Sequence, residues 1–431
     1  MNKKIINIFR WLIVIGLIGS ITFTSILVYW YYRPNTSYIN LDLDMKHWNA
    51  VADGSHNSNT DMILWNNKFY LIHASSPFHL GTSESKLLIW KSSDAKDWDK
   101  VTELDFESED DIRDPKFANI SGELFIYALA NKGLLAKPYK TVYCKSDDGK
   151  EWSAWKDLKG DAADEGWLFW RPKTPDNGTT WYVSAYWWEH GKSRLFKSTD
   201  GIEWDKVSDI YESETNDETA IEFFPDGKMI CTARLEGITD INLIGDASAS
   251  TLISVAKAPY DKWEHTKSKV TRLDGPYLFE YNGKIFAAGR FEPDARGPLT
   301  NIGSFFCRKR TSLFLVEEDA LIYLSDLPSN GDTAYTGVVI KDGYVYISYY
   351  TNDIERDYTW LIGVVSPSAI RIAKIKLSRL EKVADNPPDI PKPTVFKIDS
   401  LIMNAGLISI GIVVLIAIKR EVIDSKKILR K

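Results

Sequence analysis

The sequence predicts an all-β protein, a six-bladed β-propeller, flanked by two transmembrane helices. Three observations lead to this fold: a short strand-and-turn unit recurs six times, aromatic residues make up 13% of the 431 residues, and long apolar runs occur at the two ends. Abundant aromatic residues favour strands over helical bundles. Six repeats at intervals of roughly 45–60 residues are typical of propeller blades.

The first apolar run covers residues 11–32 and carries no charge. At 1.5 Å per residue, this length crosses a bilayer core of ~30 Å. The run is longer than the apolar region of a signal peptide, about 7–15 residues, and it ends in VYWYYRP rather than in small residues. We therefore expect an uncleaved anchor over residues 11–32, preceded by a cytoplasmic tail of residues 1–10.

A second apolar run, residues 401–418, is just long enough to span a membrane. A proline-rich linker over residues 385–400 precedes it, and a basic tail over residues 419–431 follows it. Since the basic residues lie on the terminal side of both runs, the positive-inside rule predicts two cytoplasmic termini. The propeller, residues 33–384, is then extracellular on a two-pass cell-membrane protein.

Charge and cysteine content exclude several classes of protein. The net charge is −6 although both ends are basic, so the central domain is more acidic than the whole chain and is not expected to bind nucleic acid. The three cysteines lie far apart, and the six histidines form no HExxH pattern. The residues demand no metal and no cofactor. An anionic ligand would need a local arginine cluster.

Each repeat begins with a tight turn that leads into an alternating apolar strand. In the first three repeats a further strand ends in a Ser-x-Asp turn that leads to tryptophan, as in KSDDGKEW and KSTDGIEW. The aspartate can accept hydrogen bonds from the turn, glycine permits a positive φ, and tryptophan can pack between sheets. A β-sandwich pair or a β-helix explains either the repeat or these turns, but not both. The six strands that open with a turn are NNKFYLIHA, SGELFIYAL, GTTWYVSAY, DGKMICTAR, NGKIFAAGR and DGYVYISYY.

Equivalent positions of the six repeats should face one axial pocket, because the inner strands of a propeller converge. Counted from the turn glycine, Arg113 and Glu218 lie nine residues before it, and Tyr335 lies eight residues before it. Arg234 and Arg290 lie seven residues after it. Any one such residue is more often a rim or packing residue. Together they predict a cup for an anionic sugar.

The chemistry of these residue types supports that prediction. Arginine presents a fork of donors that matches a carboxylate. Tyrosine is a weak nucleophile with a pKa near 10 unless a nearby carboxylate takes its proton. We expect Glu218 to lie within hydrogen-bond reach of Tyr335, and the arginines to lower the pKa of the phenol.

Four elements of the sequence resemble those of sialidases. Arg113-Asp114-Pro115 resembles the Arg-Ile-Pro element, and the string from Glu218 to Arg234 resembles the glutamate–arginine strand. The string GDTAYTGVVIKDGYVYISYY is similar to the strand that carries the tyrosine nucleophile, and the tryptophan turns resemble shortened Asp-boxes. The resemblance covers roughly residues 45–385 and implies a sialidase-like propeller.

Carried over to this chain, the resemblance implies a site residue by residue. Tyr335 would be the nucleophile and Glu218 the base that activates it. Arg113 and Arg234 would clamp the carboxylate of the sugar, and we prefer Arg290 as the third clamp. The Arg-Ile-Pro element belongs to the first blade of sialidases, whereas its counterpart here opens the second.

Other positions of the site stay open. Arg308 and Arg310 are alternatives for the third clamp, and Arg171 lies at a similar place in its own blade. The aspartate that serves sialidases as general acid has no match in ALANKGLLAKPYKTVY. Asp61 or Asp114 could replace it, although neither is in the expected place.

The sequence therefore favours a membrane-anchored exo-glycosidase that releases a terminal acidic sugar with retention of configuration, and its partner is a glycan. The missing acid favours an alternative, a glycan-binding propeller without catalysis. Arg-Asp-Pro also resembles an element of five-bladed glycosidases that act on fructosides and arabinosides through a carboxylate trio. A neutral or uronic sugar is thus a third possibility, and the sequence does not specify the sugar or its linkage.

Overall fold

The computed structural model describes residues 3–79, 82–106, 111–131, 140–164, 166–238, 244–293 and 301–391. One compact unit comprises Asn35–Pro391, and the N-terminal helix belongs to a separate unit. Helix α1 (Lys3–Tyr32) is long and apolar enough to cross a membrane, as a signal sequence would also be. The predicted second span and basic tail lie outside the described residues, which contain one apolar helix long enough to span a membrane.

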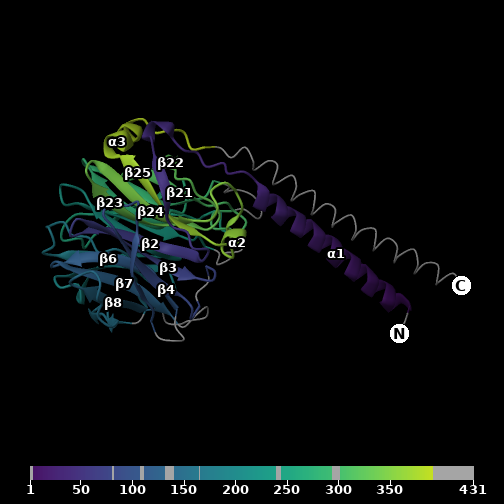
Figure 1. Cartoon of the computed structure of the whole chain (residues 1–431), viewed down its shortest axis with the longest axis horizontal. Coiled ribbons are helices and arrows are strands. Elements are labelled where there is room, and N and C mark those ends of the chain that lie inside the picture. The colour runs from purple at the N-terminus through teal and green to yellow at the C-terminus, as the bar shows by residue number, and fades with distance from the viewer. Residues whose placement is uncertain are drawn as a thin grey trace. The chain divides into compact units, whose positions relative to one another are not determined.

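Asn35–Pro391 forms the predicted propeller from six sheets, of which five have four antiparallel strands and one has a fifth strand. Strands of this unit are labelled in Figure 1. Blade 1 comprises β2 (His56–Trp65), β3 (Lys68–Ser76), β4 (Lys86–Ser92) and β5 (Asp99–Leu104). Blade 2 comprises β6 (Asp111–Ile120), β7 (Glu123–Asn131), β8 (Lys140–Ser146) and β9 (Lys156–Asp157). Blade 3 comprises β11 (Trp167–Phe169), β12 (Trp181–Trp187), β13 (Lys192–Ser198) and β14 (Glu203–Glu212), with β10 (Lys159–Gly160) added in parallel to β14.

Blades 4 to 6 repeat the same order. Blade 4 comprises β15 (Asn216–Phe223), β16 (Met229–Leu235), β17 (Ser250–Ala256) and β18 (Glu264–Ser268). Blade 5 comprises β19 (Asp274–Tyr281), β20 (Lys284–Phe291), β21 (Arg310–Val316) and β22 (Leu321–Asp326). Blade 6 comprises β23 (Thr333–Lys341), β24 (Tyr344–Thr351), β25 (Ala369–Lys376) and β1 (Lys46–Val51). Short helices are η1 (Leu41–Leu43), α2 (Trp360–Gly363) and α3 (Leu377–Asp385).

Strand β1 closes the ring. It comes from the N-terminal side of the unit, yet it pairs antiparallel with β25 as the outermost strand of blade 6. First strands of neighbouring blades contact one another, including β2 with β6 and β23, and β19 with β15 and β23. They are therefore the innermost strands, and residues at equivalent positions in them lie near one another.

The Ser-x-Asp turns form as the sequence predicts. In blade 3, Gly201 donates its backbone N–H to Ser198 Oγ at 2.9 Å, and Asp200 Oδ1 accepts from the N–H groups of Ile202 and Glu203 at 2.8 and 2.9 Å. Trp204 is fully buried among residues of blades 2 and 3. Each such turn thus fixes its own backbone and also packs its blade against a neighbour.

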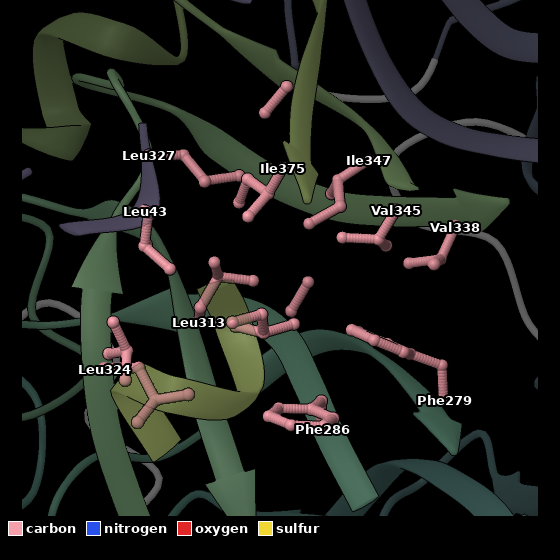
Figure 2. Close-up of a cluster of buried hydrophobic side chains, with 14 of the residues drawn as sticks. Leu43, Phe279, Phe286, Leu313, Leu324, Leu327, Val338, Val345, Ile347 and Ile375 are labelled. Atoms are coloured by element: carbon pink, nitrogen blue, oxygen red, sulfur yellow. The ribbon is translucent and has the colours of Figure 1, made fainter. Parts of the chain in front are cut away.

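The largest of the apolar clusters lies between blades 5 and 6 (Figure 2). Leucine, isoleucine, valine and phenylalanine side chains from both sheets pack against each other there, and η1 and α3 add Leu43 and Leu380. Burial of such side chains is worth about 1.5–3 kcal/mol each. Apolar packing between sheets therefore holds the wall of the propeller, and this leaves the inner strands free to carry charged groups.

Candidate active site

The innermost strands carry the site on irregular backbone. In five blades the pairing of the innermost strand with the second strand skips two residues of the innermost strand, and the first skipped residue has a positive φ. These five residues are Asn59 (52°), Asp114 (51°), Glu218 (34°), Gly275 (59°) and Tyr335 (46°). A positive φ at a residue other than glycine costs on the order of 1–3 kcal/mol and is typical of functional sites.

Three of these bulges meet in space. The backbone N–H of Gly275 donates to Glu218 Oε2 at 2.6 Å. A Cβ on Gly275 would lie 2.6 Å from the ring of Tyr335, so only glycine fits at this position. The hydroxyl of Tyr335 donates to Glu218 Oε1. Blades 4, 5 and 6 thus bring the tyrosine and the glutamate together, in the contact that the repeat positions predict.

The electrostatic environment of Tyr335 differs from the expectation. Burial raises the pKa of Tyr335 well above its usual value, and the charges of Glu218 and Asp114 raise it further. Arg234 lowers the pKa, but the other effects are larger. Arg234 thus acts in the predicted direction, but the net pKa of the phenol is raised rather than lowered. A raised pKa favours the protonated phenol, and Glu218 Oε1 is placed to accept its proton.

A pocket of about 260 Å³ opens beside this pair. Its charged residues comprise three arginines and one lysine against two glutamates. Carboxylates next to the lining, including Asp217, Asp274 and Glu292, pair with these cations, so an anionic ligand would bind through the donors that the arginines have left rather than through a net positive charge. The lining residues are His79, Glu218, Arg234, Glu236, Arg272, Arg290, Gly303, Phe305, Lys309, Tyr335 and Trp360.

Buried carboxylates hold the guanidinium group of Arg234. Asp217 lies opposite Arg234 across the β15–β16 ladder and accepts from it with both oxygens, at 2.6 Å from Nε. The Nη1 atom lies 2.8 Å from Glu218 Oε1, and Nη2 lies 3.3 Å from Glu236 Oε1. These contacts fix the guanidinium beside the Tyr335–Glu218 pair.

Blade 5 repeats this arrangement. Asp274 lies opposite Arg290 in the β19–β20 ladder, and its Oδ2 is 3.2 Å from Arg290 Nη1. Arg290 also donates to the Thr333 carbonyl at 2.8 Å and to the Tyr350 hydroxyl at 3.0 Å. Arg234 and Arg290 therefore reach the same pocket in equivalent ways, because each pairs with the aspartate that precedes the bulge of its own blade.

Sequence reasoning missed Arg272 and Lys309. Arg272 Nε donates to Asp274 Oδ1 at 2.9 Å, and Lys309 donates to Glu292. Both residues lie just before a strand, outside the repeated units from which positions were counted. A signal was present nonetheless, because Arg272 lies two residues before the aspartate of the blade 5 bulge.

The structure places Arg113 elsewhere than predicted. The bulge position of blade 2 belongs to Asp114, and Arg113 comes one residue earlier, where its Nε donates to Asp111. The error comes from the turns: blade 2 has two residues between its paired strands, Ser121 and Gly122, whereas the turn of blade 4 is longer. Arg113 is not among the described residues that line the pocket.

Arg171 and Asp61 satisfy each other away from the pocket. Arg171 Nε donates to Asp61 Oδ1 at 2.9 Å, and the same guanidinium donates to the carbonyls of Pro276 and Thr336. The other oxygen of Asp61 accepts the N–H of Phe117 at 2.7 Å. Arg171 thus ties blade 3 to blades 1, 5 and 6, and each oxygen of Asp61 already accepts a hydrogen bond within the fold.

Arg308 and Arg310 both pair with Asp357 and are fully buried. Of the three arginines considered for the third clamp, Arg290 is the one that lines the pocket. Asp114 is buried, its Oδ1 has no hydrogen-bond partner in the described part of the chain, and burial raises its pKa. The segment in which sialidases suggest a general acid lies partly outside the described residues.

Comparison with protein-family models and with curated proteins finds no match. Solved structures do match. An unknown-function protein of Dyadobacter fermentans is 14% identical, with a TM-score of 0.53, and the match covers 77% of this chain and 99% of that one. The phage phi92 endosialidase is 9% identical with a TM-score of 0.59 over 78% and 69% of the two chains.

Trypanosoma rangeli sialidase is 12% identical with a TM-score of 0.55 over 82% of this chain. The matched part is 60% of that sialidase's own length. At these identities the likeness establishes the fold, which is a sialidase-like six-bladed β-propeller.

Proposed function

We propose that this protein is a membrane-anchored glycoside hydrolase of sialidase type, which releases a terminal acidic sugar through a tyrosine nucleophile. The observation that carries the proposal is the hydrogen bond from Tyr335 to Glu218 beside a pocket with three arginines. Among the structural neighbours, one complex of Trypanosoma rangeli sialidase with 2,3-difluorosialic acid is described as a covalent intermediate. Fold and pocket are consistent with the same chemistry here.

In the first step, Tyr335 Oη attacks the anomeric carbon while Glu218 takes the phenolic proton. The bond from the anomeric carbon to the leaving oxygen breaks, and that oxygen takes a proton from a general acid. In the second step, water attacks the same carbon and gives a proton to the carboxylate that acted as the acid; the bond to Tyr335 breaks, and Glu218 returns the proton to the phenolate. Two displacements at one carbon give retention of configuration.

Asp114 is our candidate for the general acid. It occupies the bulge position of blade 2, as Glu218 and Tyr335 do in their own blades, and its charge interacts with both. A general acid must hold a proton near neutral pH, and the raised pKa of Asp114 favours its protonated form. Asp61 is the weaker candidate because Arg171 and Phe117 occupy its oxygens.

The carboxylate of the sugar is proposed to bind between Arg234, Arg272 and Arg290. All three guanidinium groups line the pocket, and acidic side chains orient each of them. Five N–H donors per guanidinium leave some for a ligand after these contacts. Binding would then need little side-chain reordering.

The second candidate function is glycan binding without catalysis. The raised pKa of Tyr335 favours it, because a neutral phenol is a poor nucleophile when no acid assists the leaving group. The same pocket would serve either function, so activity must decide between them.

The test is hydrolysis of a panel of chromogenic acidic and neutral glycosides by the full-length protein in detergent micelles. We expect turnover of an acidic glycoside, and loss of turnover with retained binding in Tyr335→Phe and Glu218→Gln. Tyr346→Phe is the matched control, because Tyr346 lies in the apolar cluster between blades 6 and 1. Binding without turnover of any glycoside would establish the glycan-binding function instead.

The proposed topology has both termini in the cytoplasm and the propeller outside. Helix α1 supports one membrane anchor. Protease added to intact cells should remove the propeller and leave the N-terminal tail intact, and a protected propeller would contradict this orientation.

A further inference from the structure

Two histidines and one aspartate meet beside the pocket. His56 Nε2 lies 3.1 Å from Asp332 Oδ2, and His79 Nδ1 lies 2.5 Å from the same oxygen. The three ligating atoms all lie within 4.8 Å of one another. His56 and Asp332 have fully buried side chains, whereas His79 is 19% exposed and lines the pocket.

Two histidines face the same oxygen of Asp332. His56 Nδ1 is 2.8 Å from the Ser366 carbonyl oxygen, which can only accept, so Nδ1 carries a hydrogen. The other nitrogen, Nε2, is hydrogen-bonded to Asp332 Oδ2, and His79 Nδ1 lies close to that oxygen as an ion pair. Metal binding displaces protons from histidine ligands, so a divalent cation can take the place of the protons that these two nitrogens direct at Asp332.

The surroundings match those of metal-binding residues. A ligating histidine usually donates its second N–H to a carbonyl or carboxylate, as His56 does to Ser366. A ligating carboxylate is usually held by hydrogen bonds on its other oxygen. Asp332 Oδ1 accepts from the Tyr350 hydroxyl and from Trp360 Nε1, both at 2.8 Å, and from Arg290 Nη2 at 3.3 Å.

The distances also suit a small divalent ion. Bonds of about 2.0 Å in a tetrahedral zinc site place neighbouring ligand atoms about 3.3 Å apart. The His56–Asp332 separation of 3.1 Å is already close to this value. His79 would need to move away from Asp332 by less than about 1 Å, and its partly exposed side chain allows such a shift.

We propose that His56, His79 and Asp332 form a binding site for a divalent transition metal ion such as Zn²⁺. Since three protein ligands leave a tetrahedral ion one open position, and His79 lines the pocket, that position is available to water or to an oxygen of a bound ligand. Sequence spacing does not reveal this site because its residues come from β2, from the segment after β3 and from the start of β23. The proposal is independent of the glycosidase proposal.

A second group of similar composition, His190, Asp217 and Glu236, provides the contrast. Arg234 contacts both carboxylates of that group, and His190 Nδ1 donates to Glu236 at 3.1 Å. The guanidinium of Arg234 binds Asp217 Oδ2, the same oxygen that faces His190, and so occupies the place of a cation. Arg290 instead contacts Oδ1 of Asp332, not the Oδ2 that faces the two histidines. We expect no metal there, which makes His190 a matched control for His79.

The experiment is zinc titration of the full-length protein, stripped with a chelator in detergent, followed by calorimetry. We expect one Zn²⁺ per chain, at least tenfold weaker binding in His79→Gln, and unchanged binding in His190→Gln. Unfolding temperature is the second readout: zinc should raise it in the wild type and in His190→Gln but not in His79→Gln. Absence of zinc binding by the wild type, or equal binding by His79→Gln, would overturn the proposal, as would loss of binding in His190→Gln alone.

Discussion

The outer turns and the inner bulges of the same blades reach unusual backbone conformations in different ways. In the outer turns, glycine takes the positive φ at Gly149 and Gly201, and the hydrogen bonds join residues two or three positions apart. In the inner bulges, Asp114, Glu218 and Tyr335 take the positive φ, and Glu218 forms hydrogen bonds with Gly275 and Tyr335 of two other blades.

The outer turns are stabilised by contacts within the turn, whereas the inner bulges are stabilised by contacts between blades. An outer turn is stable through its own residues, so it can recur with little change from blade to blade. An inner bulge holds larger side chains in a conformation that costs on the order of 1 kcal/mol or more each, and only contacts across the axis maintain it. The region with the highest conformational cost is also the region with the candidate catalytic residues.

The largest expected effect concerns the inner network. Arg234→Met would leave the buried carboxylates of Asp217 and Glu218 without their cation. Removing one partner of a buried ion pair costs about 3–5 kcal/mol, and we expect that loss in the free energy of unfolding. Arg194→Met is the matched control, because its partner Asp209 is 45% exposed, and the expected loss is below about 1 kcal/mol. Similar losses in chemical denaturation would contradict the contrast.

Acid should destabilise the wall of blade 1 through His73. Burial lowers the pKa of His73 to about 4 from 6.5, so below pH 6.5 the unfolded chain binds a proton that the folded chain does not. Stability should therefore fall as pH decreases from 6.5 to 4, by roughly 3 kcal/mol from this residue alone.

The variant His73→Leu isolates this contribution. It should show a smaller loss of unfolding free energy than the wild type over the same pH range, whatever its stability at neutral pH. Parallel pH profiles for the two proteins would show that His73 contributes nothing.

Glycine in the outer turns should be needed for close packing between blades as well as for the positive φ of the turn. A Cβ at Gly201 would lie 2.5 Å from Ile120 Cδ1 and 2.8 Å from the Tyr127 hydroxyl in the neighbouring blade. We expect Gly201→Ala to lower unfolding free energy by about 1–3 kcal/mol. Gly122→Ala has a positive φ of 88° but no atom within 4 Å, so it measures the backbone cost alone. Equal losses would mean that the contact between blades is unimportant.

The smallest expected change in stability has the opposite sign. Asp114→Asn removes a buried carboxylate whose Oδ1 has no partner in the described chain, and asparagine tolerates a positive φ. We expect unfolding free energy to rise by about 1 kcal/mol while hydrolysis of an acidic glycoside falls. A variant as active as the wild type would exclude Asp114 as the general acid. A variant less stable than the wild type would show that the buried carboxylate does not destabilise the fold.

Sequence reasoning succeeded where the physics is local. The tight turns and the Ser-x-Asp turns depend only on residues that are neighbours in the sequence. Their repetition therefore predicted the six-bladed fold. The Tyr335–Glu218 contact followed because both residues sit at the same position in their own blades. Arg113 was misplaced because positions were counted from the turn glycine, and the turns differ in length between blades. Arg272 and the His56–His79–Asp332 group depend on contacts between blades that no spacing reveals.

The most direct test of the central claim is to trap the covalent intermediate. The full-length protein is incubated with 2,3-difluorosialic acid, digested, and analysed by mass spectrometry. The account predicts one glycosyl adduct on the peptide that contains Tyr335, and no adduct in Tyr335→Phe. An adduct on another residue, or an unmodified wild-type protein that hydrolyses acidic glycosides in the same preparation, would contradict tyrosine as the nucleophile.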